Sequence, residues 1–301
     1  HIDYKVFKNL ALLLSTSGST GSPKLVRISY NNLFFNAQSI IEYLKIKNDH
    51  RTITTLPFNY SYGLSIINTH IEAGASIVMN EFSMTQKNFW EKFNSNQITS
   101  FGGVPYSYEI LKNIKFENFN FENFKYSTVA GGNLDLITLE YFLNIYKSLN
   151  KKLFVMYGQT EASPRISYLP WEKLEFKKGS IGIAIPSGKL YIKNNSKNNS
   201  DQNLVGELIY EGPNVCLGYA HNFNDLSLGD KNNGILYTGD IAKRDKEDFF
   251  YIIGRTKRIA KIFGMRISLD EIEEQLKNNA ISAACIEKEN CIFIYFTKTS
   301  D

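Results

Sequence analysis

The sequence predicts an α/β fold. It has mixed or parallel sheet layers with helices, then a small β subdomain, and then the start of a small α+β C-terminal domain. Apolar runs alternate with amphipathic segments up to about residue 158, which is typical of strands and helices that share one sheet. From about Gly179 short strand patterns dominate. After Gly254 one helical and two strand patterns remain, which is too little for an independent core.

Composition narrows the class of protein. The chain has 301 residues, with 43% hydrophobic and 21% charged residues, as expected of a soluble globular protein. A net charge of +4 gives no argument for a nucleic acid partner. No apolar run approaches the roughly 20 residues of a membrane span, and no signal peptide opens the chain. The three cysteines form no CxxC pair, so we expect free thiols and a cytoplasmic location.

The elements of the first half follow from their periodicity. Leu10–Leu14 predicts a buried strand. Ser29 and the two asparagines that follow Tyr30 predict the cap of a helix over 31–43. The remaining predicted elements are strands over 51–56, 75–79, 98–103, 127–130 and 153–156, and helices over 64–73, 89–93 and 136–149.

The second half is predicted to be mostly strands. These cover 188–193, 205–210, 235–238 and 249–253, and the polar insert 193–203 is expected to be a solvated hairpin loop. A helix over 269–277 and strands over 282–287 and 291–296 complete the chain.

The loop after the first strand is a candidate phosphate site. It is rich in hydroxyl residues and ends in Pro23 and Lys24. Its glycines let the backbone turn tightly, and successive backbone N–H groups form an anion-binding concavity. The spacing does not match a Walker A loop, and a flexible Ser/Gly linker is the structural alternative. The candidate ligands of a polyphosphate are Thr16, Ser17, Gly18, Ser19, Thr20, Gly21 and Lys24.

Three further turns follow predicted strands, where ligands gather in α/β sheets. Gly131-Gly132-Asn133 leaves bare backbone for a flat base. In the turn 157–161, a base can stack on Tyr157, Thr160 can bond a phosphate, and Glu161 can hold Mg²⁺. Asp240, in Thr238-Gly239-Asp240, can accept hydrogen bonds from ribose hydroxyls. The structural alternatives are a core role for Tyr157 and solvated turn positions for the two carboxylates.

Taken in order, these motifs resemble those of the acyl- and aminoacyl-adenylate-forming enzymes. That superfamily includes acyl-CoA synthetases, the adenylation domains of peptide synthetases, and luciferases. The matching segments are 15–24, Tyr157-Gly-Gln-Thr-Glu161, Gly206-Glu207-Leu208 with Gly212, Gly218 and Tyr219, Tyr237-Thr238-Gly239-Asp240, and 254–267 with Glu271-Ile272-Glu273.

The resemblance implies ATP-dependent activation of a small carboxylic acid as an acyl-adenylate, with release of pyrophosphate. The acyl group then passes to a thiol, either of CoA or of the phosphopantetheine on an acyl carrier protein. It also implies a hinge at Lys257, catalytic roles for Thr160, Glu161 and Lys261, and Mg²⁺ bound by Glu161. The implied ATP contacts are Thr16, Ser17, Gly18, Ser19, Thr20, Gly21, Lys24, Gly131, Gly132, Asn133, Tyr157, Gly158, Asp240 and Arg255.

The acid pocket is expected near the turns at 59–63 and 102–106. Tyr60 stands where many members carry an aromatic residue or His. Asn59 is uncharged, which favours an acid other than a common amino acid. Arg165 is a candidate partner for an anionic substrate group, with a surface salt bridge as the alternative. Tyr106 and Tyr108 either narrow the pocket or belong to the core. The candidate pocket residues are Asn59, Tyr60, Gly103, Val104, Tyr106 and Arg165.

Two departures from the family pattern lead to an alternative prediction for the function of the chain. The sequence ends before the motif that carries the family's terminal catalytic lysine, and it contains little of the family's N-terminal lobe. The alternative is a truncated or degenerate nucleotide-binding module without full turnover. A P-loop phosphotransferase is opposed by the loop spacing. The predicted domains are 1–253, an adenylation core lacking most of its N-terminal lobe, and 254–301, the hinge and a truncated C-terminal domain.

Overall fold

The computed structural model divides into two compact units. The sheet unit comprises His1–Leu190 and Tyr210–Leu236, and the C-terminal unit comprises Tyr191–Ile209 and Tyr237–Asp301. The predicted boundary between residues 253 and 254 stays a prediction. The structure describes residues 5–15, 24–193, 205–262, 265–279, 281–288 and 291–296.

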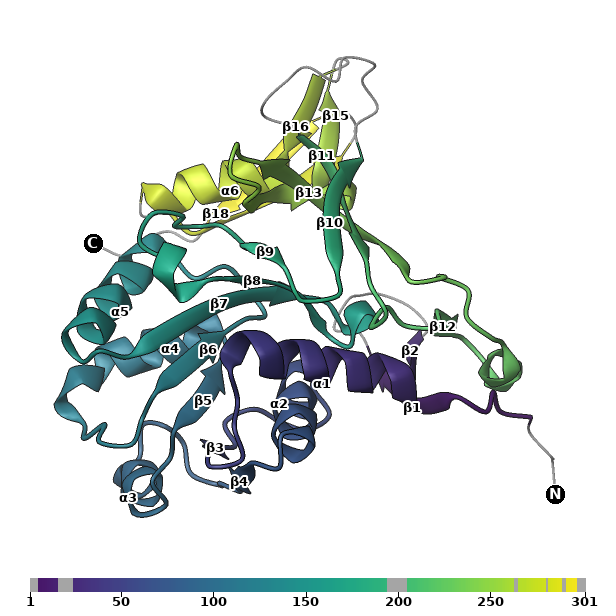
Figure 1. Cartoon of the computed structure of the whole chain (residues 1–301). Helices are drawn as coiled ribbons and strands as arrows, with labels where there is room; N and C mark the ends of the chain where they lie inside the picture. Colours follow the sequence, from purple (N-terminus) through teal and green to yellow (C-terminus); the bar gives the residue numbers. More distant parts are fainter. Residues whose placement is uncertain are drawn as a thin grey trace. The chain divides into compact units, whose positions relative to one another are not determined.

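A seven-stranded mixed sheet forms the centre of the sheet unit (Figure 1). Its first five strands run parallel, and the last two are antiparallel to their neighbours. The mixed α/β fold class is therefore confirmed. In spatial order the strands are β4 (Ser76–Val78), β3 (Arg51–Ile53), β5 (Ser100–Gly103), β6 (Tyr126–Val129), β7 (Lys152–Gly158), β8 (Arg165–Leu169) and β9 (Ile183–Ala184).

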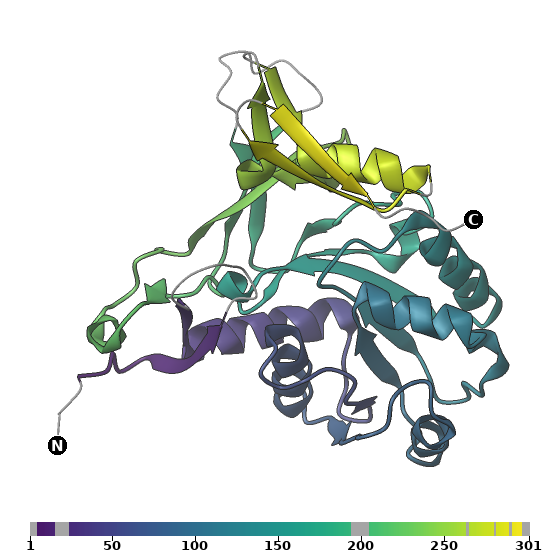
Figure 2. The same cartoon turned by 180° about the vertical axis from the view of Figure 1, so that it is seen from behind.

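Helices cover both faces of this sheet. One face carries α1 and α2, towards the viewer in Figure 1, and the other carries α4 and α5, seen from the front in Figure 2. The helix α4 starts with Pro105 in its first turn, where the missing N–H costs nothing. The helices of this unit are α1 (Tyr30–Leu44), α2 (Ser61–Glu72), α3 (Lys87–Ser95), α4 (Pro105–Asn113) and α5 (Leu136–Ser148).

Side chains on the two faces of β6 form hydrogen bonds with tyrosines from the two helix layers. Tyr62 of α2 is hydrogen-bonded through Oη to Thr128 Oγ1, with 2.6 Å between the two oxygens. On the other face, Tyr108 of α4 donates from Oη to Ser127 Oγ at 2.7 Å, and Tyr146 Oη of α5 lies 2.7 Å from the same oxygen. Successive side chains of a strand point to opposite faces, so each buried hydroxyl finds a partner in its own layer.

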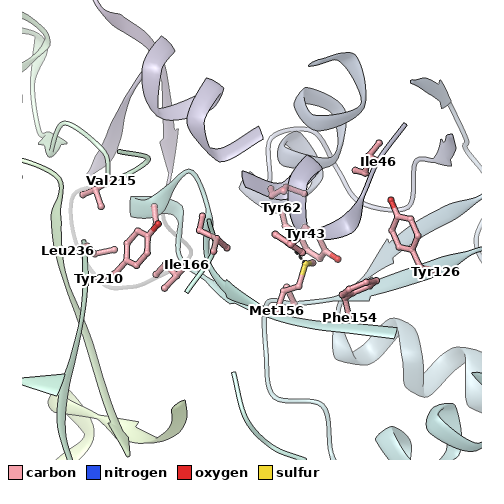
Figure 3. Close-up of a cluster of buried hydrophobic side chains, with 14 residues drawn as sticks. Tyr43, Ile46, Tyr62, Tyr126, Phe154, Met156, Ile166, Tyr210, Val215 and Leu236 are labelled. Carbon is pink, nitrogen blue, oxygen red and sulfur yellow. Dashed lines mark hydrogen bonds between the residues drawn. The ribbon is translucent and has the colours of Figure 1, made fainter. Parts of the chain in front are cut away.

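The core between α1, α2 and the sheet is rich in aromatic residues (Figure 3). Tyr43 stacks on Tyr168 with 4.1 Å between the ring centroids, and its Oη donates to Met156 Sδ at 3.0 Å. Tyr62 and Phe154 belong to the same cluster. Burial of such rings removes large apolar areas from water, which is the main favourable term in folding.

A smaller antiparallel sheet carries the first strand. Its order is β1 (Leu10–Ser15), β2 (Leu25–Ser29) and β12 (Tyr219–Ala220). The strand predicted at Leu10–Leu14 is present, but the prediction that it is buried is wrong. β1 is half-buried, because it lies at the edge of this small sheet. The predicted cap of α1 is confirmed, since Ser29 Oγ accepts from the N–H of Asn32 at 3.1 Å.

The C-terminal unit contains most of a four-stranded sheet, two hairpins and one helix. Arg258 joins its parts, because it pairs with Asp270 and Glu273 of α6. No helix in the described ranges is both long and apolar enough to cross a membrane. In order, the strands and helix are β10 (Lys189–Lys193), β11 (Val205–Glu211), β13 (Ile235–Arg244), β14 (Phe250–Arg255), β15 (Ile259–Ile262), β16 (Met265–Ser268), α6 (Leu269–Asn278), β17 (Ala283–Lys288) and β18 (Cys291–Phe296). The chain also has 3₁₀ turns η1 (Phe116–Asn118), η2 (Thr160–Ala162), η3 (Trp171–Lys173), η4 (Phe223–Ser227) and η5 (Thr256–Arg258).

Candidate functional site

Three motif residues from distant parts of the sequence meet in the sheet unit. Lys24 directly precedes β2, and its Nζ lies 3.8 Å from the centroid of the Tyr219 ring. The hydroxyl of Tyr219 donates to Glu161 Oε1 at 2.8 Å. Burial, and then the charge of Glu161, raise the pKa of Tyr219, so its hydroxyl stays protonated and donates. We call these three residues the Lys24–Tyr219–Glu161 cluster.

A buried arginine fixes the segment that carries Tyr219. Arg27 on β2 is fully buried, and its guanidinium donates to the carbonyls of Leu217 at 2.8 Å, Tyr219 at 3.1 Å and Gly229 at 3.2 Å. Leu228 accepts a further hydrogen bond from it. One cation thus satisfies several backbone acceptors, and this aligns β12 beside β2.

The turn after β7 is held by a close backbone contact. A Cβ atom at Gly158 would lie 2.0 Å from the carbonyl oxygen of Pro164, so a larger residue does not fit. The same oxygen accepts from the N–H of Gln159 at 2.9 Å. Thr160 opens the short η2 turn, and its Oγ1 lies 3.2 Å from Oγ of Ser61, the first residue of α2. This contact of Ser61 with Thr160 was not predicted from the sequence.

Glu161 is a suitable ligand for Mg²⁺. It is half-buried and offers one carboxylate. Among the described residues, no group of three or more His, Cys, Asp or Glu side chains is placed to hold a metal ion. Mg²⁺ usually binds one or two carboxylates together with phosphate oxygens and water. The cluster therefore fits a metal that arrives with a polyphosphate.

The glycine turn after β6 adjoins the predicted acid pocket. Gly131 has φ +86°, and a Cβ there would lie 2.4 Å from the hydroxyl of Tyr60 and 3.4 Å from the side chain of Val104. Gly132 and Asn133 follow it and are exposed. The turn predicted to contact the base of the nucleotide is therefore packed against residues predicted to line the acid pocket.

Arg165 differs most from its prediction among the pocket residues. It is 2% exposed, and the described residues provide no ion pair for it, so the surface salt bridge considered from the sequence is wrong. Its guanidinium carbon lies 4.8 Å from the centroid of the Tyr62 ring. Tyr106 is 68% exposed at the start of α4, whereas Tyr108 is a core residue. Of the other candidates, Gly103 is buried, Tyr60 and Val104 are half-buried, and Asn59 is exposed.

The predicted ribose ligand lies in the C-terminal unit. Asp240 is 2% exposed and sits inside β13, so the alternative of a solvated turn residue is wrong. Its Oδ1 accepts from Arg255 Nε at 3.0 Å. The two residues are directly paired across β13 and β14. The side chain of Arg255 is 68% exposed, so this ion pair faces solvent on one side.

Several candidates are described in part or not at all. Lys257 lies in η5, and Lys261 pairs with Arg266 across β15 and β16; only their backbones are described. The phosphate loop is described at its flanks, where Ser15 is paired with Leu25. The candidates outside the described residues are Thr16, Ser17, Gly18, Ser19, Thr20 and Gly21.

Similarity to known proteins identifies the family of the chain. A family model described as AMP-binding enzyme matches residues 7–220. The chain belongs to the AMP-binding enzyme family. The matched region contains the whole Lys24–Tyr219–Glu161 cluster and the turns after β6 and β7.

Several members of the AMP-binding enzyme family resemble the chain individually. A long-chain-fatty-acid–CoA ligase of Escherichia coli O6:H1 is 27% identical, over 89% of this chain and 48% of its own length. An indoleacetate–CoA ligase of Aromatoleum aromaticum is 28% identical, over 88% and 51%. The chain spans about half the length of these curated relatives. The structure of an O-succinylbenzoate coenzyme A synthetase from Bacillus subtilis, in complex with ATP and magnesium ion, matches with a TM-score of 0.78 and 27% identity, over 94% of this chain and 59% of that one.

Proposed function

We propose that the chain supplies the ATP- and acid-binding part of an AMP-forming acid–thiol ligase. The observation that carries the proposal is the Lys24–Tyr219–Glu161 cluster, with Thr160 next to Glu161 in the sequence. A fixed cation, a carboxylate suited to Mg²⁺ and a hydroxyl within one small region match the charge of a nucleoside triphosphate. Family membership and the relatives named as CoA ligases support the same activity.

Each residue has a distinct task in this proposal. Lys24 and the loop before it bind the terminal phosphates, and Tyr219 orients Glu161 through its hydrogen bond. Glu161 holds Mg²⁺, which neutralises charge on phosphate oxygens when it is bound. Thr160 contacts the α-phosphate. Gly131, Gly132, Asn133, Tyr157 and Gly158 line the base, and Asp240 and Arg255 bind the ribose.

The chemistry has two balanced steps. An oxygen of the substrate carboxylate forms a bond to the α-phosphorus of ATP, the bond from that phosphorus to the bridging oxygen breaks, and pyrophosphate leaves. A thiolate then attacks the acyl carbon, the bond to the AMP oxygen breaks, and AMP leaves. The acceptor is the thiol of CoA, with the phosphopantetheine of an acyl carrier protein as the alternative. Lys261 faces the acceptor in this proposal, and Lys257 is the hinge.

Exchange of labelled pyrophosphate into ATP tests the first step. The chain is expected to catalyse exchange only when a carboxylic acid is present, and Glu161→Gln is expected to lose it. Glu172→Gln is the matched control, because Glu172 is an exposed glutamate in η3. Binding of Mg·ATP without exchange for any acid would instead identify a nucleotide-binding module without turnover. Equal exchange by the Glu161→Gln variant would overturn the metal assignment.

A further inference from the structure

A small cavity lies between α1, α2 and the main sheet. Its volume is about 20 Å³, which is room for one or two waters or a group of similar size. Tyr62, Tyr126 and Met156 line it and are seen together in Figure 3. Arg165 and His70 also line it.

The cavity contains an unneutralised cation. Arg165 Nε is buried without a hydrogen-bond partner in the described part of the chain. The described residues that line the cavity include no Asp or Glu. An arginine stays charged in proteins, and burial of a charge without a partner is costly. Because the ring of Tyr62 covers one face of the guanidinium, its edge is the part that can donate to an anion.

The histidine in the cavity is arranged as a neutral acceptor. His70 Nδ1 lies 2.8 Å from the carbonyl oxygen of Ile66. A carbonyl only accepts, so Nδ1 carries the proton and Nε2 does not. His70 Nε2 is buried and has no partner among the described residues. Burial lowers the pKa of His70 to about 4, so Arg165 is the charged group in the cavity lining at neutral pH.

Two residues that line the cavity, Tyr62 and Arg165, are close neighbours of the turn that carries Thr160. Arg165 is directly paired with Gly158 across β7 and β8. Tyr62, which stacks on Arg165, follows Ser61, whose hydroxyl lies 3.2 Å from that of Thr160. Neighbouring Cα atoms are about 3.8 Å apart, so the backbone of Tyr62 lies close to Thr160. A ligand that contacts both Thr160 and Arg165 needs a short spacer between its two contacting groups.

We propose that Arg165 binds the second carboxylate of a short dicarboxylic acid, while the first carboxylate is activated beside Thr160. This inference rests on the proposed function and names its substrate class. The carboxylate group is the part of the acid that enters the cavity, whose volume of about 20 Å³ leaves no room for the spacer.

Matched pairs of acids test the proposal by pyrophosphate exchange. Succinate is compared with butyrate, and glutarate with pentanoate, because each pair differs in one carboxylate. The chain is expected to prefer the dicarboxylic acid by about 50-fold in kcat/KM, since a charge-assisted hydrogen bond in a buried site is strong. Arg165→Met is expected to remove the preference mainly by raising KM, and Arg165→Lys to keep part of it. Arg51→Met is the matched control, because the half-buried Arg51 guanidinium, within the described part of the chain, donates only to the carbonyl of Asn96.

A thermal-unfolding series keeps the test independent of turnover. Succinate is expected to raise the melting temperature of the chain but not that of Arg165→Met. Arg165→Met alone is expected to be at least as stable as the chain, since it removes an unpaired buried charge.

Equal use of both acids in each pair, or an unchanged preference in Arg165→Met, would overturn the inference and leave the proposed function standing. An equal thermal shift with chloride would also overturn it, because the cavity would then be a site for any small anion. Exchange with no acid at all would contradict the proposed function, and the succinate-dependent thermal shift would still decide the role of Arg165.

Discussion

His70 is expected to make the folded chain less stable as the pH falls from about 6.5 to about 4. Burial comes first among the causes that lower its pKa to about 4, and the charge of His50 adds to it, whereas the bond to the Ile66 carbonyl opposes both. In the unfolded chain the imidazole has a pKa of about 6.5. Between these values the unfolded state binds more protons than the folded state, so the free energy of unfolding decreases as the pH decreases.

The size of the effect follows from the difference between the two pKa values. They differ by about 2.5 units, and one unit corresponds to about 1.4 kcal/mol, so His70 costs the folded state about 3 kcal/mol by pH 4. The side chain is 3% exposed, which leaves little solvent to screen the charge. No loss from this residue is expected above about pH 6.5, and the loss is complete below about pH 4.

Urea unfolding at several pH values measures this directly. The free energy of unfolding is compared between the chain and His70→Gln at about pH 7.5, 6, 5 and 4. The decline between pH 6.5 and 4 is expected to be shallower in the variant, whatever its absolute stability. His221→Gln is the matched control, because His221 is exposed. Burial also lowers the pKa of His50, and all three proteins keep that burial. Equal declines in the chain and in His70→Gln would refute the reasoning.

Three further substitutions test other parts of the structure. Tyr219→Phe removes the hydrogen bond to Glu161 and is expected to weaken Mg·ATP binding about 5-fold, with little change for metal-free ATP, in calorimetric titrations. Arg27→Met removes hydrogen bonds to several backbone carbonyls and is expected to lower the free energy of unfolding by about 3 kcal/mol in urea. Gly131→Ala is expected to cost about 2 kcal/mol, from its positive φ and its clash with the hydroxyl of Tyr60. In a Tyr60→Phe background the cost is expected to fall to about 1 kcal/mol, because only the backbone strain remains.

Each of these substitutions has an outcome that contradicts it. Equal weakening of ATP binding with and without metal would contradict the link from Tyr219 to Glu161. Arg51→Met is the control for Arg27→Met, and an equal loss of stability in both variants would mean that the bonds to the β12 segment carry no special weight. An unchanged cost of Gly131→Ala in the Tyr60→Phe background would show that the hydroxyl is not the obstacle.

Local rules predicted the elements whose environment matches their sequence. The helix after Ser29 was predicted because its cap and its apolar period agree, and the structure has both. The strands β3 to β7 were predicted because strands in a parallel sheet are short apolar runs. The helix α4 was missed, because the Gly-Gly-Val-Pro sequence before it indicates a turn and Pro105 hides the start of the helix.

The burial of a residue and the strand with which its own strand pairs depend on the rest of the molecule. They are therefore predicted less well from the sequence. The leucines of β1 indicate a buried strand, yet its partner β2 places it at the edge of a small sheet. β8 begins at Arg165, and a charged residue is not typical of a buried strand. The strand was therefore not predicted, and a surface salt bridge was considered for Arg165. Its burial depends on Tyr62 and the cavity, which come from other elements. Asp240 follows a glycine in a motif typical of a turn, but β13 continues through it.

Titration of the chain with Mg·ATP in a calorimeter is the most direct test of the central claim, that these motifs form a nucleotide site. Saturable binding at one site is expected, weakened by Glu161→Gln in the presence of Mg²⁺ and abolished by Asp240→Ala. Glu172→Gln is predicted to bind like the chain itself. Absence of binding by a chain that unfolds cooperatively, or equal affinity in all the variants, would contradict the account.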